Sequence, residues 1–182
     1  MRRTDREIRS QALVDQVLAQ AQVCRLALCK DSQPYMVPVS FGYDGACVYF
    51  HTAPTGMKLD FIAANDRVCF EVEHDVKLRP HATNPCQWSF SFFSVIGFGR
   101  VREVTAPEDK IQALNQIMRH YSGREWAFDG PALGKIRVWR IAIERLTGKQ
   151  SKDKKPGRPF RAILPRYPRG GCRPDKACPS KD

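Results

Sequence analysis

The stretch from Tyr35 to Lys58, YMVPVSFGYDGACVYFHTAPTGMK, decides the fold, because its pattern changes from strand-like to helix-like within one short span. Residues 35–43 are rich in apolar and β-branched side chains, and Asp44-Gly45 is a strong signal for a tight hairpin turn. Residues 46–51 resume the strand pattern, and 57–64 have the composition of a short helix. We therefore expect two antiparallel strands, then a turn that leads into a helix.

The segments on either side extend this antiparallel pattern. Thr4-Asp5-Arg6-Glu7 fits a capping box and predicts a helix from about residue 5 to 20. A second capping box, at 105–108, predicts a helix that continues to about residue 121. Further strands are expected at 23–29, 67–73, 88–104 and 135–146, with a loop at 74–87. Two or three helices are too few to cover both faces of a parallel sheet. We therefore predict a mainly β fold, a small antiparallel barrel with helices attached.

The chain divides by composition into a domain, residues 1–148, and a basic, proline-rich tail, residues 149–182. The tail holds eleven of the 30 Lys and Arg but three of the 19 Asp and Glu, so it carries +8 of the net charge of +11. Such charge runs are usually solvated, and no folded nucleic-acid-binding motif accompanies this one. We do not expect nucleic acid as a partner. The apolar patch at 160–164 predicts instead that the tail packs on a surface, such as that of a partner subunit.

Several functional classes can be set aside. No apolar run approaches the ~20 residues that a membrane span needs, and the charged N-terminus does not resemble a signal peptide, so a cytoplasmic location is expected. The seven cysteines include no CxxC pair and are expected to be thiols, with the role of Cys172 and Cys178 left open. The spacing of His74, His81 and Cys86 matches no familiar metal site, so no metal is predicted.

The turn 52–56 has two interpretations on its residues alone. A helix that begins near Gly56 offers free backbone N–H groups, Lys58 adds a positive charge, and Thr52 and Thr55 add hydroxyl donors; together they suit a phosphate. The alternative is a plain turn with a solvated lysine. His51, at the end of the strand, is then either a hydrogen-bonded rim histidine or a neighbour of the bound ligand.

Six stretches, in the same order, resemble one family. They are MRRTDREI, DSQPYMVPVSFGYD, VYFHTAPTGMKLDFI, NDRVCFEVE, WSFSFFSVIGFGRV and ERLTGK. The chain is similar over about residues 1–150 to the pyridoxamine 5′-phosphate oxidase-like flavoproteins, and within them to the branch that includes 5-nitroimidazole reductases. The tail lies outside this resemblance.

The resemblance implies a split β-barrel that forms a homodimer, with FMN held in grooves at the subunit interface. It implies that Val37, Pro38 and Val39 run beside the isoalloxazine ring, and that His51 and Thr52 lie near the flavin and its phosphate chain. Lys58 would pair with the phosphate, Ser94 would approach from the other subunit, and Trp139 would lie near the cofactor. His51 would be the catalytic proton donor.

One departure from the family bears on the substrate. The stretch FSVIGFGRV keeps Gly-Arg-Val but lacks the charged and amide residues that precede it in pyridoxamine phosphate oxidases, so that reaction is not expected. The expected function is an FMN-dependent oxidoreductase that reduces a small organic acceptor, with the electron donor unidentified. Three alternatives stay open: a non-catalytic flavin-binding module, a binding protein that acts through its basic tail, and a haem protein with His74, His81 or His120 as axial ligand.

Overall fold

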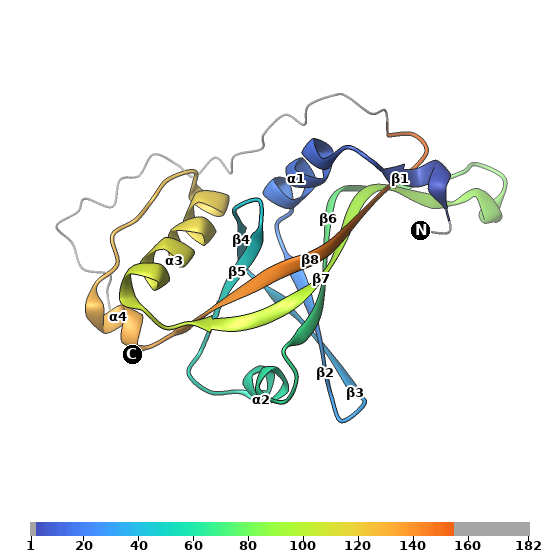
Figure 1. Ribbon diagram of the computed structural model, residues 1–182. Helices are drawn as coiled ribbons and strands as arrows, with labels where there is room; N and C mark the ends of the chain where they lie inside the picture. Colours follow the sequence, from blue (N-terminus) through green and yellow to red (C-terminus); the bar gives the residue numbers. More distant parts are fainter. Residues whose placement is uncertain (1–2, 155–182) are drawn as a thin grey trace, which may run out of the picture.

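The computed structural model describes residues 3–154 of the 182 and consists of one curled antiparallel sheet with helices at its rims (Figure 1). The eight-stranded sheet has the order β3-β2-β6-β7-β8-β5-β4, and β1 pairs with β8. The two end strands, β3 and β4, follow one another in the chain but do not pair, so the barrel remains split between them. The predicted mainly β, antiparallel fold is confirmed.

The elements have the following bounds. The strands are β1 (Glu7–Ile8), β2 (Cys24–Lys30), β3 (Gln33–Val39), β4 (Phe41–Tyr43), β5 (Cys47–Thr52), β6 (Arg67–Arg79), β7 (Ser89–Val104) and β8 (Arg137–Gln150). The helices are α1 (Gln11–Gln20), α2 (Met57–Ala64), α3 (Pro107–Ser122) and α4 (Gly130–Gly134), with short 3-10 turns at Thr4–Arg6 and Pro85–Gln87.

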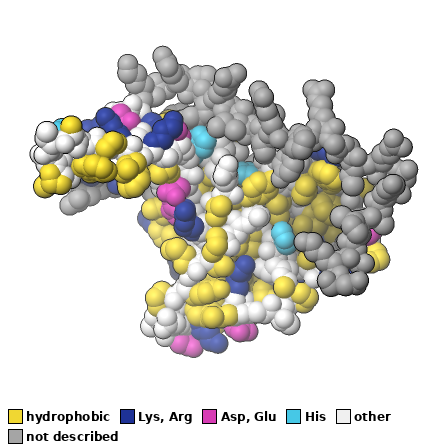
Figure 2. All heavy atoms as spheres, turned by 180° about the vertical axis from the view of Figure 1, so that it is seen from behind, with side chains coloured by type: hydrophobic (Ala, Val, Ile, Leu, Met, Phe, Trp, Pro, Cys, Tyr) yellow, Lys and Arg dark blue, Asp and Glu magenta, His cyan; other side chains and the backbone are white. Residues whose placement is uncertain are grey.

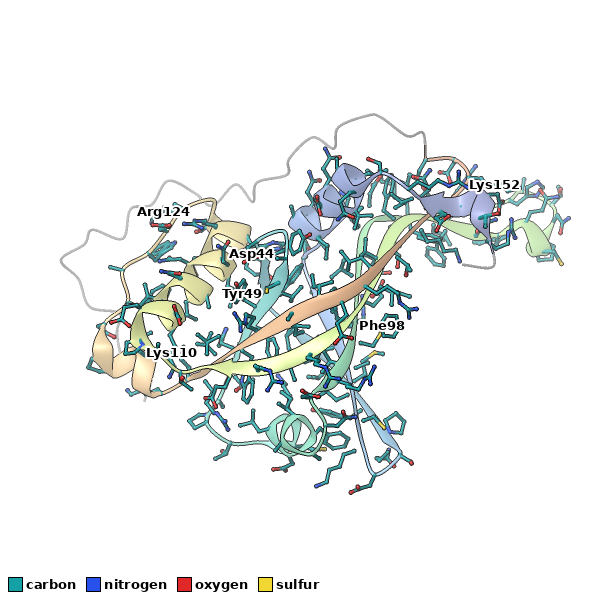
Figure 3. All side chains as sticks on the ribbon, in the orientation of Figure 1. Asp44, Tyr49, Phe98, Lys110, Arg124 and Lys152 are labelled. Atoms are coloured by element: carbon teal, nitrogen blue, oxygen red, sulfur yellow. The ribbon has the colours of Figure 1, made fainter. Side chains whose placement is uncertain are left out.

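The expected strand at 35–43 is divided by the structure. It breaks at Ser40, because β3 pairs with β2 while β4 pairs with β5 across the hairpin. The hairpin itself is as predicted. Asp44 organises its turn: one carboxylate oxygen accepts the backbone N–H groups of Ala46 and Cys47, and the other accepts the Tyr49 hydroxyl at 2.7 Å (Figure 3).

Both predicted capping boxes are wrong. The first helix begins at Gln11, where the Ser10 hydroxyl accepts the backbone N–H of Leu13, because residues 7–8 instead pair with β8 as β1. The last long helix, α3, begins at Pro107 after Ala106, and no side chain caps it. Pairing with a distant strand supplied the backbone partners that the first box would have supplied locally.

The predicted loop at 74–87 is also wrong over its first part. Strand β6 continues to Arg79 and pairs with the start of β7 through a bulge after His74, where Asp75 takes a positive φ of 51°. These two strands extend beyond the barrel as an arm, residues 75–92 (Figure 1). Four apolar side chains of the arm are about half exposed: Val76, Leu78, Trp88 and Phe90. Figure 2 shows hydrophobic side chains along the lower edge of this projection, at the left of that view.

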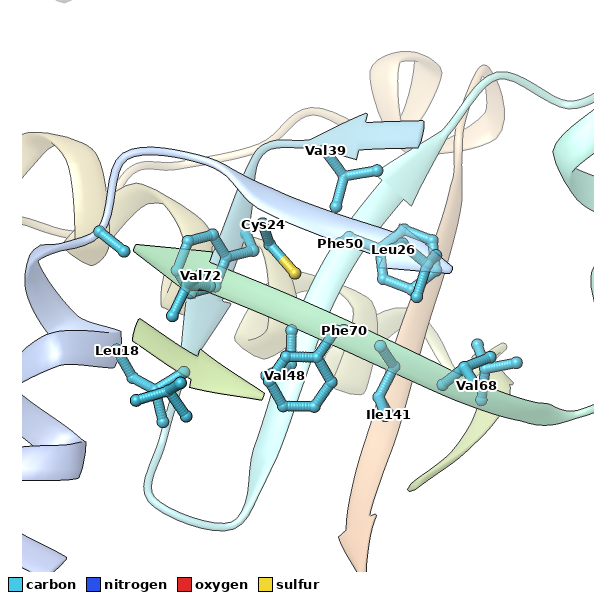
Figure 4. Close-up of a cluster of buried hydrophobic side chains, with 14 of the residues drawn as sticks. Leu18, Cys24, Leu26, Val39, Val48, Phe50, Val68, Phe70, Val72 and Ile141 are labelled. Carbon is cyan, nitrogen blue, oxygen red and sulfur yellow. The ribbon is translucent and has the colours of Figure 1, made fainter. Parts of the chain in front are cut away.

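The hydrophobic core fills the barrel. Phe50, Phe70 and Ile141 are among its fully buried side chains, and Figure 4 shows them facing one another from β5, β6 and β8. Gly97 allows this packing, because a Cβ there would lie 2.1 Å from the Phe70 ring. A second hydrophobic cluster packs α3 on the sheet. Its buried members are Ala113, Leu114 and Ile117 of α3 and Val138 of β8.

Three further observations concern membrane-spanning helices, metal ligands and cysteines. None of the helices within residues 3–154 has the length and hydropathy that crossing a membrane requires. Within the same residues no group of three or more His, Cys, Asp or Glu side chains could hold a metal ion. The five cysteines of this part are free thiols, whereas Cys172, Cys178 and the apolar patch 160–164 lie outside the described residues.

Folding stability is expected to decrease as the pH falls from about 7.5 to about 5.5. We expect His120 to contribute to this decrease. Its Nε2 lies 2.7 Å from the carbonyl oxygen of Ala21, its ring packs on Phe41 at 4.4 Å, and burial lowers its pKa. The unfolded chain therefore takes up a proton near the ordinary pKa of 6.5, which the folded chain resists. Urea unfolding of His120→Gln at both pH values should show a smaller decrease in the free energy of unfolding than the unsubstituted chain.

The same substitution at His81, whose ring lies on the arm away from the core, provides the control. An unchanged decrease in His120→Gln would contradict the assignment.

Candidate functional site

The turn between β5 and α2 has the geometry of an anion site. Gly56 precedes the helix with a φ of 138°, a conformation that L side chains rarely adopt. No side chain caps α2, and the backbone N–H of Leu59 bonds back to the carbonyl oxygen of Gly56. The N–H groups of Met57 and Lys58, at the positive end of the helix dipole, are therefore suited to an external acceptor.

Lys58 carries a positive charge that the described residues do not offset. Its side chain is half-buried, and desolvation lowers the pKa of its ammonium group. Asp60 lies in the same turn, yet no ion pair joins any carboxylate of residues 3–154 to Lys58. A partly desolvated ammonium group gains free energy when an anion binds beside it.

His51 lies within electrostatic range of Lys58. Its pKa is lowered, first by desolvation and then by the positive charge of Lys58. The imidazole is accordingly neutral near pH 7, with one nitrogen that donates and one that accepts a hydrogen bond. The structure thus brings together the histidine and the lysine that the sequence singled out.

Replacing Lys58 with methionine is expected to raise the pKa of His51. The substitution removes the positive charge, while desolvation remains and holds the pKa below its ordinary value. An NMR titration of the His51 ring measures the change, and Lys110→Met, on α3, is the matched control. A His51 pKa that stays the same or falls in Lys58→Met would show that the two side chains are not coupled.

Thr52 differs from its expected role. Its hydroxyl is buried, donates to the carbonyl oxygen of Ala53 at 2.8 Å and accepts the indole N–H of Trp139 at 3.1 Å. The hydroxyl is therefore committed inside the barrel and is not presented as a donor to a phosphate. Trp139, which is also buried and stacks on Phe50, contacts the candidate site through Thr52. These two residues support the end of β5.

The segment Val37-Pro38-Val39 lies on the free edge of the sheet. β3 pairs with β2 on one side, and no described strand pairs with its other side, which is the position that Pro38 requires. Tyr35 of β3 packs against Phe61 of α2, with ring centroids 5.0 Å apart. This contact joins β3 to α2, the helix that carries Lys58.

Ser94 lies elsewhere within this chain. It belongs to β7, pairs with Glu73 of β6 and Lys149 of β8, and donates its hydroxyl to Glu71 at 3.0 Å. Among the described residues no contact joins it to His51 or Lys58. Its expected approach from a second subunit remains a prediction.

Sequence reasoning missed a cleft of about 420 Å³ between α2 and the adjoining parts of β7 and β8. Trp139 lines it, as do Glu103 and Arg137, which form a two-pronged ion pair. The partners lie 34 positions apart in the chain, so no local spacing could have indicated them. Apolar and charged residues alternate in GRVREV, residues 99–104, but this pattern predicts a strand rather than a cleft.

Comparison with known sequences matches one family model and one uncharacterised relative. Residues 10–150 match the family model described as pyridoxamine 5′-phosphate oxidase. An uncharacterised protein of Rhizobium meliloti is 32% identical over 92 residues, which amount to 50% of this chain and 53% of that protein. The chain thus spans about half the length of this curated relative.

Solved structures share the fold. A proposed 5-nitroimidazole antibiotic resistance protein from Bacteroides thetaiotaomicron is 29% identical, with a TM-score of 0.70 over 79% of this chain and 85% of that one. An FAD-binding protein from Mesorhizobium loti is 28% identical, with a TM-score of 0.59 over 80% and 97% of the two chains. An FAD and haem binding protein from Mycobacterium smegmatis, at 19% identity and a TM-score of 0.72 over 84% and 77%, shows likeness of fold alone. The family model covers most of the chain, and the chain therefore belongs to the pyridoxamine 5′-phosphate oxidase family of split β-barrels.

Proposed function

We propose that this chain binds a flavin at the turn between β5 and α2, and that the flavin is FMN. The observation that carries the proposal is the half-buried ammonium group of Lys58 beside an uncapped helix N-terminus, with no carboxylate of the described residues to offset it. A terminal phosphate would supply the missing negative charge and accept the free N–H groups. One anion site of this kind suits one terminal phosphate group. FMN ends in such a group, which favours FMN over FAD.

The surrounding residues fit the rest of such a ligand. The free edge of β3, along Val37, Pro38 and Val39, offers backbone groups for the polar rim of a flavin ring, and the exposed side chain of Pro38 offers an apolar surface. The described relative from Mesorhizobium loti, an FAD-binding protein, supports a flavin and makes FAD the alternative that the experiment must exclude.

The proposed activity is reduction of a small organic acceptor, such as a nitro compound. A bound flavin supplies hydride or electron-pair transfer. His51 in its imidazolium form would donate a proton to the acceptor and become the neutral imidazole that its lowered pKa favours. Its lowered pKa makes the imidazolium form a stronger acid, although less of it is present at neutral pH. Similarity to the Bacteroides resistance protein supports the nitro-group class.

The haem alternative has weaker support from the three candidate histidines. The ring of His120 packs against Phe41 and its Nε2 is engaged with the carbonyl oxygen of Ala21, so that nitrogen is not available to a haem iron. The Nδ1 of His81 accepts two backbone N–H groups on the exposed arm. His74 is half-buried beside the backbone of Gln20. A flavin-binding module without turnover remains the second candidate.

The absorption spectrum and the mass of the released cofactor test these proposals together. Freshly purified protein should show a flavin spectrum and release a compound with the mass of FMN, and the reduced protein should be reoxidised by a 5-nitroimidazole without oxygen. Release of FAD would overturn the choice of FMN, and a Soret band would overturn the flavin assignment. A flavin that is not reoxidised would leave the non-catalytic module.

We also propose that the chain forms a homodimer through the arm, residues 75–92, with cofactor sites at the interface. Val76, Leu78, Trp88 and Phe90 are each between 45% and 54% exposed, an apolar surface that a second copy would bury. Asp153, just after β8, tethers the arm, since Ser91 donates to it at 2.6 Å. The free thiols support a cytoplasmic location, and the electron donor remains to be identified.

The paired substitution Leu78→Glu and Phe90→Glu is expected to convert the homodimer to a monomer. The two residues pair across the arm, so two carboxylates would enter the apolar surface and repel each other. Sedimentation equilibrium measures the mass in solution. Val23→Glu, at a 40% exposed valine outside the arm, is the control. A dimer that persists in the double variant would place the interface elsewhere.

A further inference from the structure

The four residues that follow β8, residues 151–154, form a short strap against the arm (Figure 1). The backbone N–H of Ser151 donates to the carbonyl oxygen of Phe92 at 3.0 Å, and the Phe92 N–H donates to the Ser151 hydroxyl at 3.1 Å. The Lys154 N–H donates to the Ser151 carbonyl oxygen at 3.1 Å and closes the strap into a turn. Ser151 is 5% exposed, so the strap begins with a buried connection to β7.

Two charged side chains of the strap contact both strands of the arm. Asp153 accepts the hydroxyl of Ser91, on β7, at 2.6 Å and forms an ion pair with Arg79, on β6, at 3.2 Å. Lys154, whose side chain is 11% exposed, donates to the carbonyl oxygen of Asp75 at 3.2 Å and also to its carboxylate. Hydrogen bonds to charged groups are the stronger ones, and Ser91 is itself buried. The strap therefore joins the two strands of the arm to the end of β8.

The arm lacks other support beyond its base. β7 pairs with β8 as far as Phe93 and Gln150, and β6 pairs with β2 as far as Val72. Beyond these points residues 77–79 and 89–91 pair with each other, and among residues 3–154 no third strand joins them. A bulge also interrupts the ladder where the arm begins. Because an isolated two-stranded ribbon is marginally stable in water, the contacts of the strap matter for the order of the arm.

The strap contacts the polar face of the arm. Side chains alternate between the two faces of a strand, so Arg79 and Ser91 lie on one face, and Leu78 and Phe90, each one position earlier, lie on the other. The side chains of Leu78 and Phe90 are 54% and 53% exposed. The strap thus holds the polar face and leaves the apolar face open.

From this arrangement we propose that the strap, residues 151–154, is a conformational device that keeps the arm ordered with its apolar face exposed. Release of the strap opens the arm and leaves the barrel folded. The strap also controls assembly, because an ordered arm presents a preformed apolar surface to a second copy of the chain. This last step rests on the proposed homodimer, whereas the effect on the arm operates within one chain.

Hydrogen–deuterium exchange of the full chain, followed by mass spectrometry, tests the effect on the arm. In the double variant Asp153→Ala and Lys154→Ala, peptides from residues 75–92 should exchange at least about tenfold faster, with peptides from β5 and α3 unchanged. Ser91→Ala, which removes one contact from the side of the arm, should give a smaller increase in the same peptides. Lys152→Ala, at an exposed lysine of the strap, is the control and should change neither region. Unchanged exchange in the arm, or an equal increase in arm and barrel, would overturn the proposal.

A second measurement separates this proposal from that of the homodimer. Exchange is repeated at protein concentrations where sedimentation equilibrium shows a monomer, and the increase caused by the double variant should persist there. An increase that appears in the dimer alone would overturn the effect within one chain. If every form were monomeric and the arm still opened in the double variant, the strap would stand and the homodimer would fail. A double variant that opens the arm but dimerises as tightly as the unsubstituted chain would contradict the control of assembly.

Discussion

Lys58→Met is expected to weaken FMN binding by roughly tenfold to a hundredfold, the loss that follows removal of one hydrogen-bonded charge partner. Methionine keeps the length and the apolar stem of the lysine but removes the half-buried ammonium group beside the N-terminus of α2. Quenching of flavin fluorescence on titration of the cofactor-free protein measures the affinity. Lys110→Met, on α3, should bind FMN as the unsubstituted chain does.

Riboflavin sharpens this experiment because it lacks the phosphate. If Lys58 pairs with the phosphate, the substitution should weaken FMN but change riboflavin affinity little. Equal losses for the two flavins would show that Lys58 contacts the ring or supports the fold instead. An unchanged FMN affinity would show that the turn between β5 and α2 does not bind the phosphate. The proposed function would then lose the observation that carries it.

Gly42→Ala is expected to be strongly destabilising, with a loss of roughly 3 kcal/mol in the free energy of unfolding. A Cβ at this position of β4 would lie 2.4 to 2.6 Å from backbone atoms of Gln116 and Ile117. A backbone clash cannot be relieved by a change of rotamer, so α3 must move away from the sheet. The hydrogen bond from the Phe41 N–H to the Tyr121 hydroxyl, 3.1 Å long, would be strained by that movement.

Thermal unfolding measures this effect as a decrease in Tm of about 6 to 12 °C for a domain of this size. Gly134→Ala is the matched control, because nothing lies within 4 Å of a Cβ there and its φ is not positive. It should leave Tm nearly unchanged. A Gly42→Ala protein with the Tm of the unsubstituted chain would mean that α3 does not pack closely on β4 in solution.

Local features of the chain were predicted well. The Asp44-Gly45 hairpin, the helix at 57–64 and the sequence of strand-like segments each depend on side chains that are close in sequence, and the structure has all of them. The proximity of His51 and Lys58 follows in the same way, since a single turn separates the end of β5 from the start of α2. The resemblance to a flavoprotein family depended on such short stretches, and the family match confirmed it.

The sequence by itself therefore determined the antiparallel class of the fold, the hairpin and the turn before α2, because hydrogen bonds and dihedral preferences between near neighbours decide these. Only the tertiary structure decided which strand changes partner at Ser40, where the arm begins, and that residues 7–8 form a strand. It also brought the Thr52 hydroxyl to the indole N–H of Trp139, which lies 87 positions away. Such contacts depend on how the sheet curls, and pairing between distant strands, rather than any local pattern, determines that curl.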